Sequence, residues 1–154
     1  MQKPRPALPV EIAQFHSNEY VDFLSRISPD NQEAFGDEID RYLSEDCPVF
    51  DGLFPFCQLY AGASIEGAKK LNHGLVDIAI NWGGGLHHAK KNGASGFCYV
   101  NDLVLAIVGE AITPLADNNS HVPCHVPLPC LTLYFSWSLM QRCSSTTLGC
   151  CTST

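Results

Sequence analysis

The stretch Val76-Asp77-Ile78-Ala79-Ile80-Asn81-Trp82-Gly83-Gly84-Gly85-Leu86-His87-His88 decides the predicted fold. Its first part, Val76–Asn81, is a short apolar and β-branched run next to glycines, which is typical of a buried strand. We predict an internal strand of a parallel sheet, and therefore an α/β fold. The three glycines that follow let the main chain approach a ligand closely. Because ligands of open α/β sheets bind outside the carboxyl ends of the strands, this loop is a candidate site.

Two adjacent histidines end this loop and supply its chemistry. Neighbouring side chains usually diverge, so His87 and His88 are poor joint ligands of a single metal ion. An imidazole titrates near neutral pH, and a pair in unequal environments can therefore supply one base and one electrostatic partner. The alternative is a pair of surface histidines on a polar loop.

Cap residues and apolar spacing predict helices on both sides of the loop. The expected ranges are Ser17 or Asn18 to Pro29, the acidic segment Asp37 to Leu43, Ser64 to about Gly74, and Asn101 or Asp102 to about Gly109. The last helix should stop at Gly109, Thr113 and Pro114.

Two more motifs accompany the histidine loop. Residues Gly96–Asp102 read GFCYVND, and Glu45–Phe54 read EDCPVFDGLF. In this order, the three motifs closely resemble the class I (RPD3-type) zinc-dependent histone deacetylases, which hydrolyse acetyl-lysine amides. The resemblance runs from about Lys3 to Ile107 and covers an early-to-middle slice of a catalytic domain. It implies an incomplete arginase/deacetylase-like three-layer fold with a parallel sheet core.

The resemblance also implies roles for single residues. By it, His88 is the general base and then the general acid, and His87 is its electrostatic partner. Substrate-binding positions are the rim aspartate Asp46, Gly96, whose backbone faces the substrate's methylene chain, and Phe97, a wall of the acetyl-lysine channel. The lower pocket below the channel is matched by Phe56, Leu86 and Cys98.

The family's zinc ligands have no counterpart that we recognise in this chain. The family uses an aspartate and a histidine from a later strand end, plus a distant second aspartate, with a fourth position left open. After Asp102 the only carboxylates are Glu110 and Asp117, and the only histidines are His121 and His125. The family's catalytic tyrosine follows a glycine run, whereas Tyr134 sits within the apolar run LTLYF. We therefore predict that the isolated chain is inactive.

Composition divides the chain at about residue 110. The net charge of -7 lies entirely in residues 1–110, because Asp117 and Arg142 cancel in the remainder. Residues 111–154 hold four of the ten prolines and five of the eight cysteines, and we predict a divergent, poorly ordered tail. The cysteine spacing does not match a zinc finger, and without a recognisable secretory segment we expect free thiols.

Neither nucleic acid nor a membrane is an expected partner. Lys69-Lys70 and Lys90-Lys91 are isolated basic pairs, unlike the patch that tracks phosphates. The apolar run Leu128–Met140 is shorter than the roughly 20 residues that span a bilayer, and Pro129 interrupts it.

Two functions from different classes remain open. The first is a nuclear histone deacetylase that acts on acetylated histone tails with corepressor proteins, as the resemblance implies. The alternative is a non-catalytic interaction protein that competes for corepressor or histone partners, since the motifs survive while the zinc ligands do not. A third reading is a product with no function of its own. Co-purification with such partners without deacetylase activity would favour the interaction protein.

Overall fold

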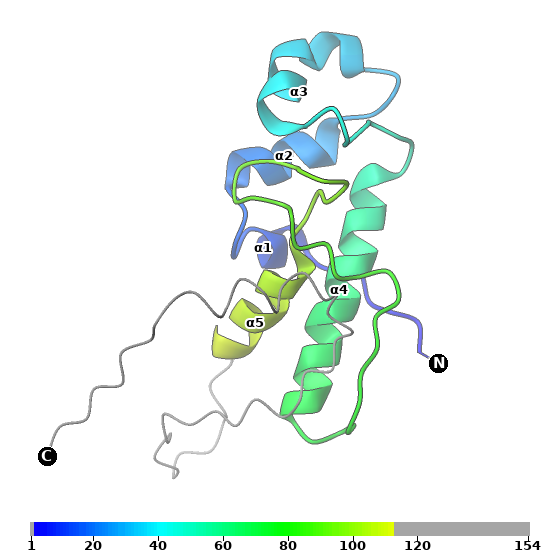
Figure 1. Cartoon of the computed structure of the whole chain (residues 1–154), viewed down its shortest axis with the longest axis vertical. Helices are drawn as coiled ribbons and strands as arrows, with labels where there is room; N and C mark the ends of the chain where they lie inside the picture. The colour runs from blue at the N-terminus through cyan, green and yellow to red at the C-terminus, as the bar shows by residue number, and fades with distance from the viewer. Residues whose placement is uncertain (1, 113–154) are drawn as a thin grey trace, which may run out of the picture.

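The computed structural model describes residues 2–112, which form helices connected by long loops (Figure 1). The elements are α1 (Pro9–Ile12), α2 (Asn18–Arg26), a 3-10 helix (Gln32–Phe35), α3 (Gly36–Tyr42), α4 (Leu53–Asn72) and α5 (Asp102–Ile112). The long α4 has α2 beside its first half, and α5 lies against it further along (Figure 1). The loop between α4 and α5 runs back along α4 and carries the histidine pair.

The predicted helix after Ser17 is confirmed as α2. The Ser17 hydroxyl accepts a hydrogen bond from the Tyr20 amide at 3.4 Å, which satisfies one of the free amides of the first turn. Tyr20, Phe23 and Leu24 are buried, as their helical spacing predicts. The helix ends at Arg26, three residues before Pro29.

The prediction that Ser64 begins the third helix is wrong. Helix α4 begins eleven residues earlier, at Leu53, after Gly52 in a left-handed conformation with φ of 75°. Pro55 is tolerated there because the first turn needs no amide hydrogen-bond donor. Ser64 is buried in the middle of the helix and uses its hydroxyl for tertiary contacts. The predicted end is confirmed, since the helix stops at Asn72 before two turn residues.

The acidic helix and the last helix are also found, with altered ends. The acidic segment forms α3 directly after the 3-10 helix. Helix α5 begins at Asp102, and the Asn101 side chain accepts the Val104 amide at 3.2 Å as its cap. Gly109 does not stop α5, which continues to Ile112; Thr113 and Pro114 lie outside the described residues. The short helix α1 was not predicted.

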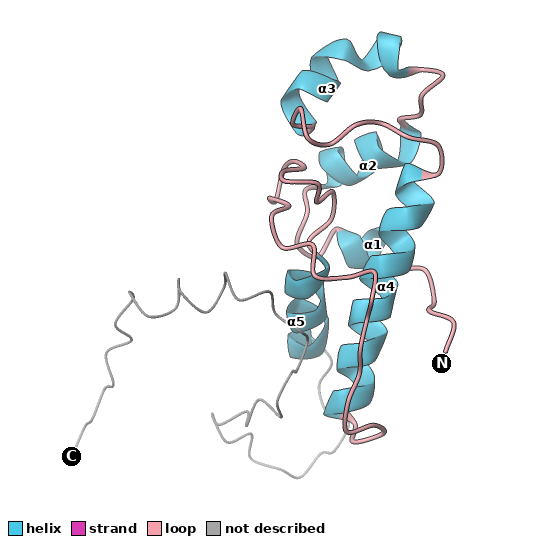
Figure 2. Cartoon of the chain, turned by 45° about the vertical axis from the view of Figure 1, so that its right-hand side comes forward, coloured by secondary structure: helices cyan, strands magenta, loops and turns pink. Residues whose placement is uncertain are grey.

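The predicted strand at Val76–Asn81 is wrong, because the residues that the structure describes contain no strand (Figure 2). This segment lies outside any regular element, and no main-chain hydrogen bond joins Val76–Ile80 to another described residue. Ile78 and Ile80 are 69% and 59% exposed. A strand needs neighbours for its backbone hydrogen bonds, and residues 2–112 supply none. The parallel sheet is therefore not found in this range.

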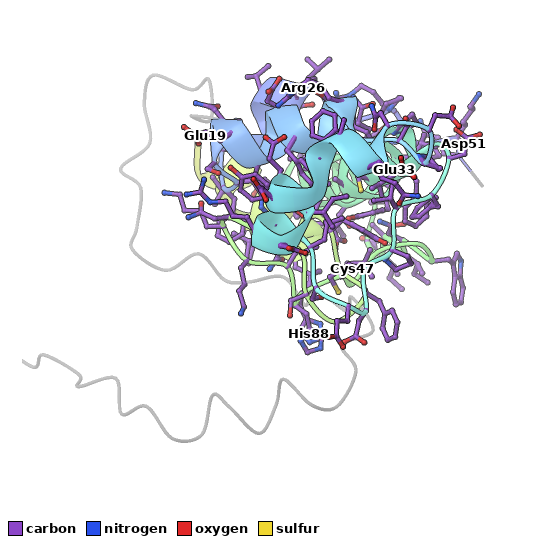
Figure 3. All side chains as sticks on the ribbon, turned by 90° about the horizontal axis from the view of Figure 1, so that it is seen from above. Glu19, Arg26, Glu33, Cys47, Asp51 and His88 are labelled. Carbon is purple, nitrogen blue, oxygen red and sulfur yellow. The ribbon has the colours of Figure 1, made fainter. Side chains whose placement is uncertain are left out.

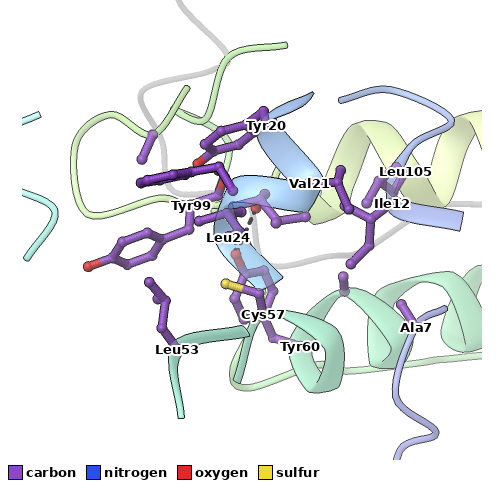
Figure 4. Close-up of a cluster of buried hydrophobic side chains, with 14 of the residues drawn as sticks. Ala7, Ile12, Tyr20, Val21, Leu24, Leu53, Cys57, Tyr60, Tyr99 and Leu105 are labelled. Carbon is purple, nitrogen blue, oxygen red and sulfur yellow. Dashed lines mark hydrogen bonds between the residues drawn. The ribbon is translucent and has the colours of Figure 1, made fainter. Parts of the chain in front are cut away.

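The hydrophobic core lies where α2, α4 and the loop before α5 meet (Figure 4). Three buried tyrosines tie that loop down through their hydroxyls. Tyr20 donates to the Tyr99 carbonyl at 2.8 Å, and Tyr99 donates to the Pro48 carbonyl at 2.6 Å. Tyr60 donates to the Val100 carbonyl at 3.0 Å and accepts the Val100 amide at 2.7 Å. The loop that leads into α5 is thereby held against two helices.

The segment before α1 crosses α4 at a glycine. A Cβ atom on Gly62 would lie 1.9 Å from the Arg5 carbonyl oxygen, so only glycine allows this approach. Two hydrogen bonds between Ala7 and Gln58, of 2.8 and 2.9 Å, complete the crossing. Among the described residues, no helix has both the length and the apolar character to cross a membrane. The thiols of Cys47, Cys57 and Cys98 are free and buried.

Candidate functional site

The glycine loop that precedes the histidines folds around the side chain of Asn81. The Asn81 amide group donates to the Tyr60 carbonyl at 2.9 Å and to the Ser64 hydroxyl at 2.8 Å, both on α4. Its side-chain oxygen accepts the Gly83 amide at 3.2 Å. At Gly85 the chain turns with φ of 90°, a conformation that glycine adopts without strain. The loop is therefore attached to α4 at its start.

A buried carboxylate holds the second half of the loop. Asp102, at the beginning of α5, is fully buried. It accepts the Leu86 amide at 2.8 Å and the Gly85 amide at 3.0 Å. It also accepts the Ser64 hydroxyl at 2.5 Å. The two amides belong to the residues immediately before the histidine pair.

Asn101 holds the loop beyond this point. Its side-chain amide donates to the His87 carbonyl at 3.0 Å and to the Ala89 carbonyl at 3.1 Å. Its main-chain amide donates to Nε2 of the buried His16 at 3.0 Å, and Nδ1 of His16 lies 3.3 Å from the Lys91 carbonyl oxygen. Because Nε2 accepts, the proton of the neutral ring is on Nδ1. Burial lowers the pKa of His16.

The two histidine rings lie near each other at the rim of the molecule. Their centroids are 4.2 Å apart with an angle of 34° between the ring planes. Nδ1 of His87 is 3.1 Å from the Gly85 carbonyl oxygen, so the loop orients this ring. His88 is exposed and lies at the edge in Figure 3. A neutral imidazole at such a position can exchange a proton with a bound ligand or water.

The motif Gly96–Asp102 returns to the histidines through a tight turn. An isolated bridge pairs Ser95 with Cys98, and the two residues between them, Gly96 and Phe97, have φ of 54° and 66°. A Cβ atom on Gly96 would lie 3.1 Å from Cγ of His88, so the ring packs against a bare glycine. Phe97 is 72% exposed in a conformation that non-glycine residues rarely adopt.

The structure brings some of the predicted site residues together and leaves others apart. Burial raises the pKa of the Cys98 thiol, and the main-chain amides of His88 and Ala89 partly offset this. The Cys98 thiol donates to the Gly96 carbonyl at 3.4 Å, so Cys98 joins His88 and Gly96 in one cluster, and Leu86 lies half-buried before the pair. The described hydrogen bonds, ion pairs and ring contacts do not join the exposed Asp46 or Phe56 to this cluster. Phe56 instead packs edge-on against Phe50 and Tyr60.

Sequence reasoning missed the residues that position the loop. Asn101 and Asp102 were assigned only as helix caps, and Ser64 as a helix start. In the structure, Asn101 and Asp102 accept or donate hydrogen bonds that hold the histidine loop, and Ser64 donates to Asp102. His16 was not assigned at all. A signal was present, since two polar residues directly follow the apolar run Cys98–Val100 and precede an apolar helix. Polar groups enclosed in this way are usually buried with hydrogen-bond partners.

The side chains of residues 2–112 do not form a metal centre. No three histidine, cysteine, aspartate or glutamate side chains in this range lie close enough together to hold a metal ion. His87 and His88 are two such groups, and within residues 2–112 no third ligand joins them. The described residues therefore do not fit a zinc ion.

Comparison with known proteins shows the relationship. The histone deacetylase domain model matches residues 1–113. Histone deacetylase 9 of Arabidopsis thaliana is 64% identical over 107 residues, which are 69% of this chain and 25% of that protein. Histone deacetylase B of Dictyostelium discoideum is 57% identical over 108 residues, which are 70% of this chain and 26% of that protein.

Histone deacetylase RPD3 of Saccharomyces cerevisiae is 54% identical over 107 residues, which are 69% of this chain and 25% of that protein. The chain thus matches about a quarter of the length of these relatives. A histone deacetylase domain has an α/β fold of the arginase/deacetylase type, of which residues 2–112 show helices and loops. With the histidine loop, the two further motifs and these matches, the chain belongs to the histone deacetylase domain family and, within it, to the class I, RPD3-type proteins.

Proposed function

We propose that this chain is the histidine-loop part of a histone deacetylase, a nuclear enzyme that removes acetyl groups from lysines of histone tails. One observation carries the proposal: His88 of the histidine loop meets Gly96 and Cys98 of the following motif at one place. Gly96 lies against the ring of His88, and the Cys98 thiol donates to the Gly96 carbonyl at 3.4 Å. A position proposed to bind substrate and a position proposed to transfer protons are therefore neighbours.

The arrangement suits the two proton transfers of an amide hydrolysis. His88, exposed and beside the glycine, would take a proton from the attacking water and return it to the departing lysine amine. His87, whose ring centroid lies 4.2 Å from that of His88, would act as the electrostatic partner in this proton transfer. Gly96 leaves room for the methylene chain of the substrate, and Phe97 would cover one side of it. Asp46 would hold the substrate backbone at the rim.

Zinc supplies the Lewis acid in this family, and residues 2–112 do not fit that ion. The roles assigned to this chain therefore stop at binding and proton transfer. General acid-base catalysis contributes about 10²–10⁴-fold, which is far less than amide hydrolysis needs. We expect the isolated chain to hydrolyse no acetyl-lysine peptide at a useful rate.

The test has two parts. Hydrolysis of an acetyl-lysine histone peptide is measured with the purified chain in the presence of zinc, beside its His88→Ala variant. We expect no turnover in either, and turnover that His88→Ala abolishes would refute the predicted inactivity. The second part records the NMR spectrum of the chain with the acetylated peptide and with the same peptide unacetylated. Shifts at Gly96 and Phe97 with only the acetylated peptide would support the assigned sites, and equal spectra would refute them.

A second candidate function is a non-catalytic interaction protein that competes for corepressor or histone partners. The observation that favours it is the exposure of Ile78, Ile80 and Trp82 on one extended segment, with Trp82 84% exposed. Three exposed apolar side chains on one segment would supply the apolar surface that a protein interface needs. Binding of purified histone or corepressor proteins is measured with the chain and with an Ile80→Ser variant. Equal binding by both, or binding by neither, would refute this candidate.

A further inference from the structure

We propose that Asp102 is the positioning residue of the histidine loop. Its carboxylate fixes the main chain just before His87 and His88 and so decides where the two imidazoles stand relative to Gly96. The inference rests on the proposed function, because it names a group that would place the proton-transferring residues. The experiment below needs no turnover, so it can fail while the proposed function stands, and the reverse.

The contacts of Asp102 point to the loop rather than to its own helix. One carboxylate oxygen accepts the Leu86 amide, and the other accepts the Gly85 amide and the Ser64 hydroxyl. All three donors lie outside α5. The helix-capping task is carried out by Asn101, whose side-chain oxygen accepts the Val104 amide. Capping of α5 therefore does not explain the direction of the Asp102 carboxylate.

Burial makes these contacts effective. Asp102 is fully buried, so water does not compete for its oxygens, and hydrogen bonds to a charged group are stronger than those between neutral groups. The loop also fits closely around it, because a Cβ atom on Gly84 would lie 2.5 Å from the carboxylate. A shift of the carboxylate therefore has to move the loop.

Asn101, the residue before Asp102, also holds the histidine loop. Asn101 donates to the carbonyls of His87 and Ala89 and so fixes the main chain on both sides of His88. Asp102, the next residue, holds the main chain before the pair, at Gly85 and Leu86. Ser64 connects the carboxylate to α4, against which α5 packs. The position of the histidines thus depends on how these two helices meet.

The experiment is amide hydrogen exchange of the full chain followed by NMR, with the Asp102→Asn variant beside it. Asparagine keeps one acceptor oxygen, which can stay on Leu86, while its NH2 group can donate to Ser64. We therefore expect exchange at Gly85 to rise roughly 10- to 100-fold in Asp102→Asn, while Leu86 changes less. We also expect the nuclear Overhauser effect between the Gly96 Hα protons and the His88 ring to be lost, because the ring would no longer pack against the glycine.

A matched control separates positioning from general stability. Gln58→Ala removes one part-buried hydrogen bond, to the Ala7 carbonyl, which is not a contact of the loop between α4 and α5, and should lower the melting temperature without changing the histidine loop. The proposal is overturned if Gln58→Ala loses the Gly96–His88 signal as Asp102→Asn does, or if Asp102→Asn keeps it. If Asp102→Asn does not fold, the unmodified chain decides: fast exchange at both Gly85 and Leu86 would overturn the proposal, and protection at both would support it.

Discussion

The replacement of Gly84 by alanine should destabilise the chain strongly, for a reason of space alone. The backbone of Gly84 is not in the left-handed region, so alanine could adopt it. The added Cβ atom, however, would lie 2.5 Å from the Asn81 amide nitrogen, 2.5 Å from the Asp102 carboxylate and 2.9 Å from the Ser64 hydroxyl. Each of these atoms is already held by hydrogen bonds, so none can move without breaking one.

The magnitude follows from these contacts. Breaking one hydrogen bond to a buried carboxylate costs about 1.5–3 kcal/mol. Forcing an extra methyl group into a packed site costs about 1–3 kcal/mol more. Replacing glycine restricts the unfolded chain, which returns about 0.4–1 kcal/mol. The free energy of unfolding should therefore fall by about 2–5 kcal/mol, a large part of the stability of a small domain.

The adjacent glycine supplies the control. A Cβ atom on Gly83 would lie 3.8 Å from both Asn81 Oδ1 and Tyr60 Cβ, which is ordinary van der Waals contact. Gly83→Ala should therefore leave the free energy of unfolding unchanged or raise it by about 0.5 kcal/mol. Urea unfolding followed by circular dichroism measures both variants. Equal unfolding midpoints for Gly84→Ala and Gly83→Ala would refute this account of the site's packing.

Three more predictions follow from single contacts. Gly62→Ala should detach the segment at Arg5 from α4, lower stability by about 3 kcal/mol or more, and speed amide exchange at Ala7, because the Cβ atom overlaps a backbone oxygen. His16 is buried and its pKa is lowered, so the unfolded state binds the proton first; stability should be constant above about pH 6.5 and fall below it by about 1.4 kcal/mol per pH unit until the folded pKa is reached. Urea midpoints at pH 7.5 and 5.5 should therefore differ more in the unmodified chain than in His16→Gln, and equal differences would contradict this. Phe97→Gly should be at least as stable as the unmodified chain, and Phe97→Val should lose about 1 kcal/mol or more, because φ at this position is 66°; thermal melts in which valine matches glycine would speak against strain here.

Local signals in the sequence predicted the helices better than the sheet. Ser17 and Asn101 cap α2 and α5 through their own side chains, and such bonds involve residues only three apart. The start of α4 was missed because a long helix with Pro55 in its first turn has no cap residue to announce it. The strand at Val76–Asn81 was predicted from an apolar run alone. A strand forms only with partners, and residues 2–112 contain no neighbour for it.

The candidate site divides in the same way. The histidine pair, Gly96 and Phe97 were identified from their motifs, and their assigned roles remain predictions. The structure adds the contact between Gly96 and the His88 ring, which no spacing in the sequence reveals. It also adds Asp102 and Ser64, whose partners lie sixteen or more residues away along the chain.

By itself, the sequence determined the family of this protein and the places where its capped helices begin, because motif identity and helix caps depend on residues close together in the chain. Only the tertiary structure decided which polar residues hold the histidine loop. Asp102 becomes an anchor because α5 packs against α4, which buries its carboxylate beside Ser64 and leaves the loop amides as its remaining donors. Such a role arises from burial and long-range contact, and neither can be predicted from residues that are adjacent in the sequence.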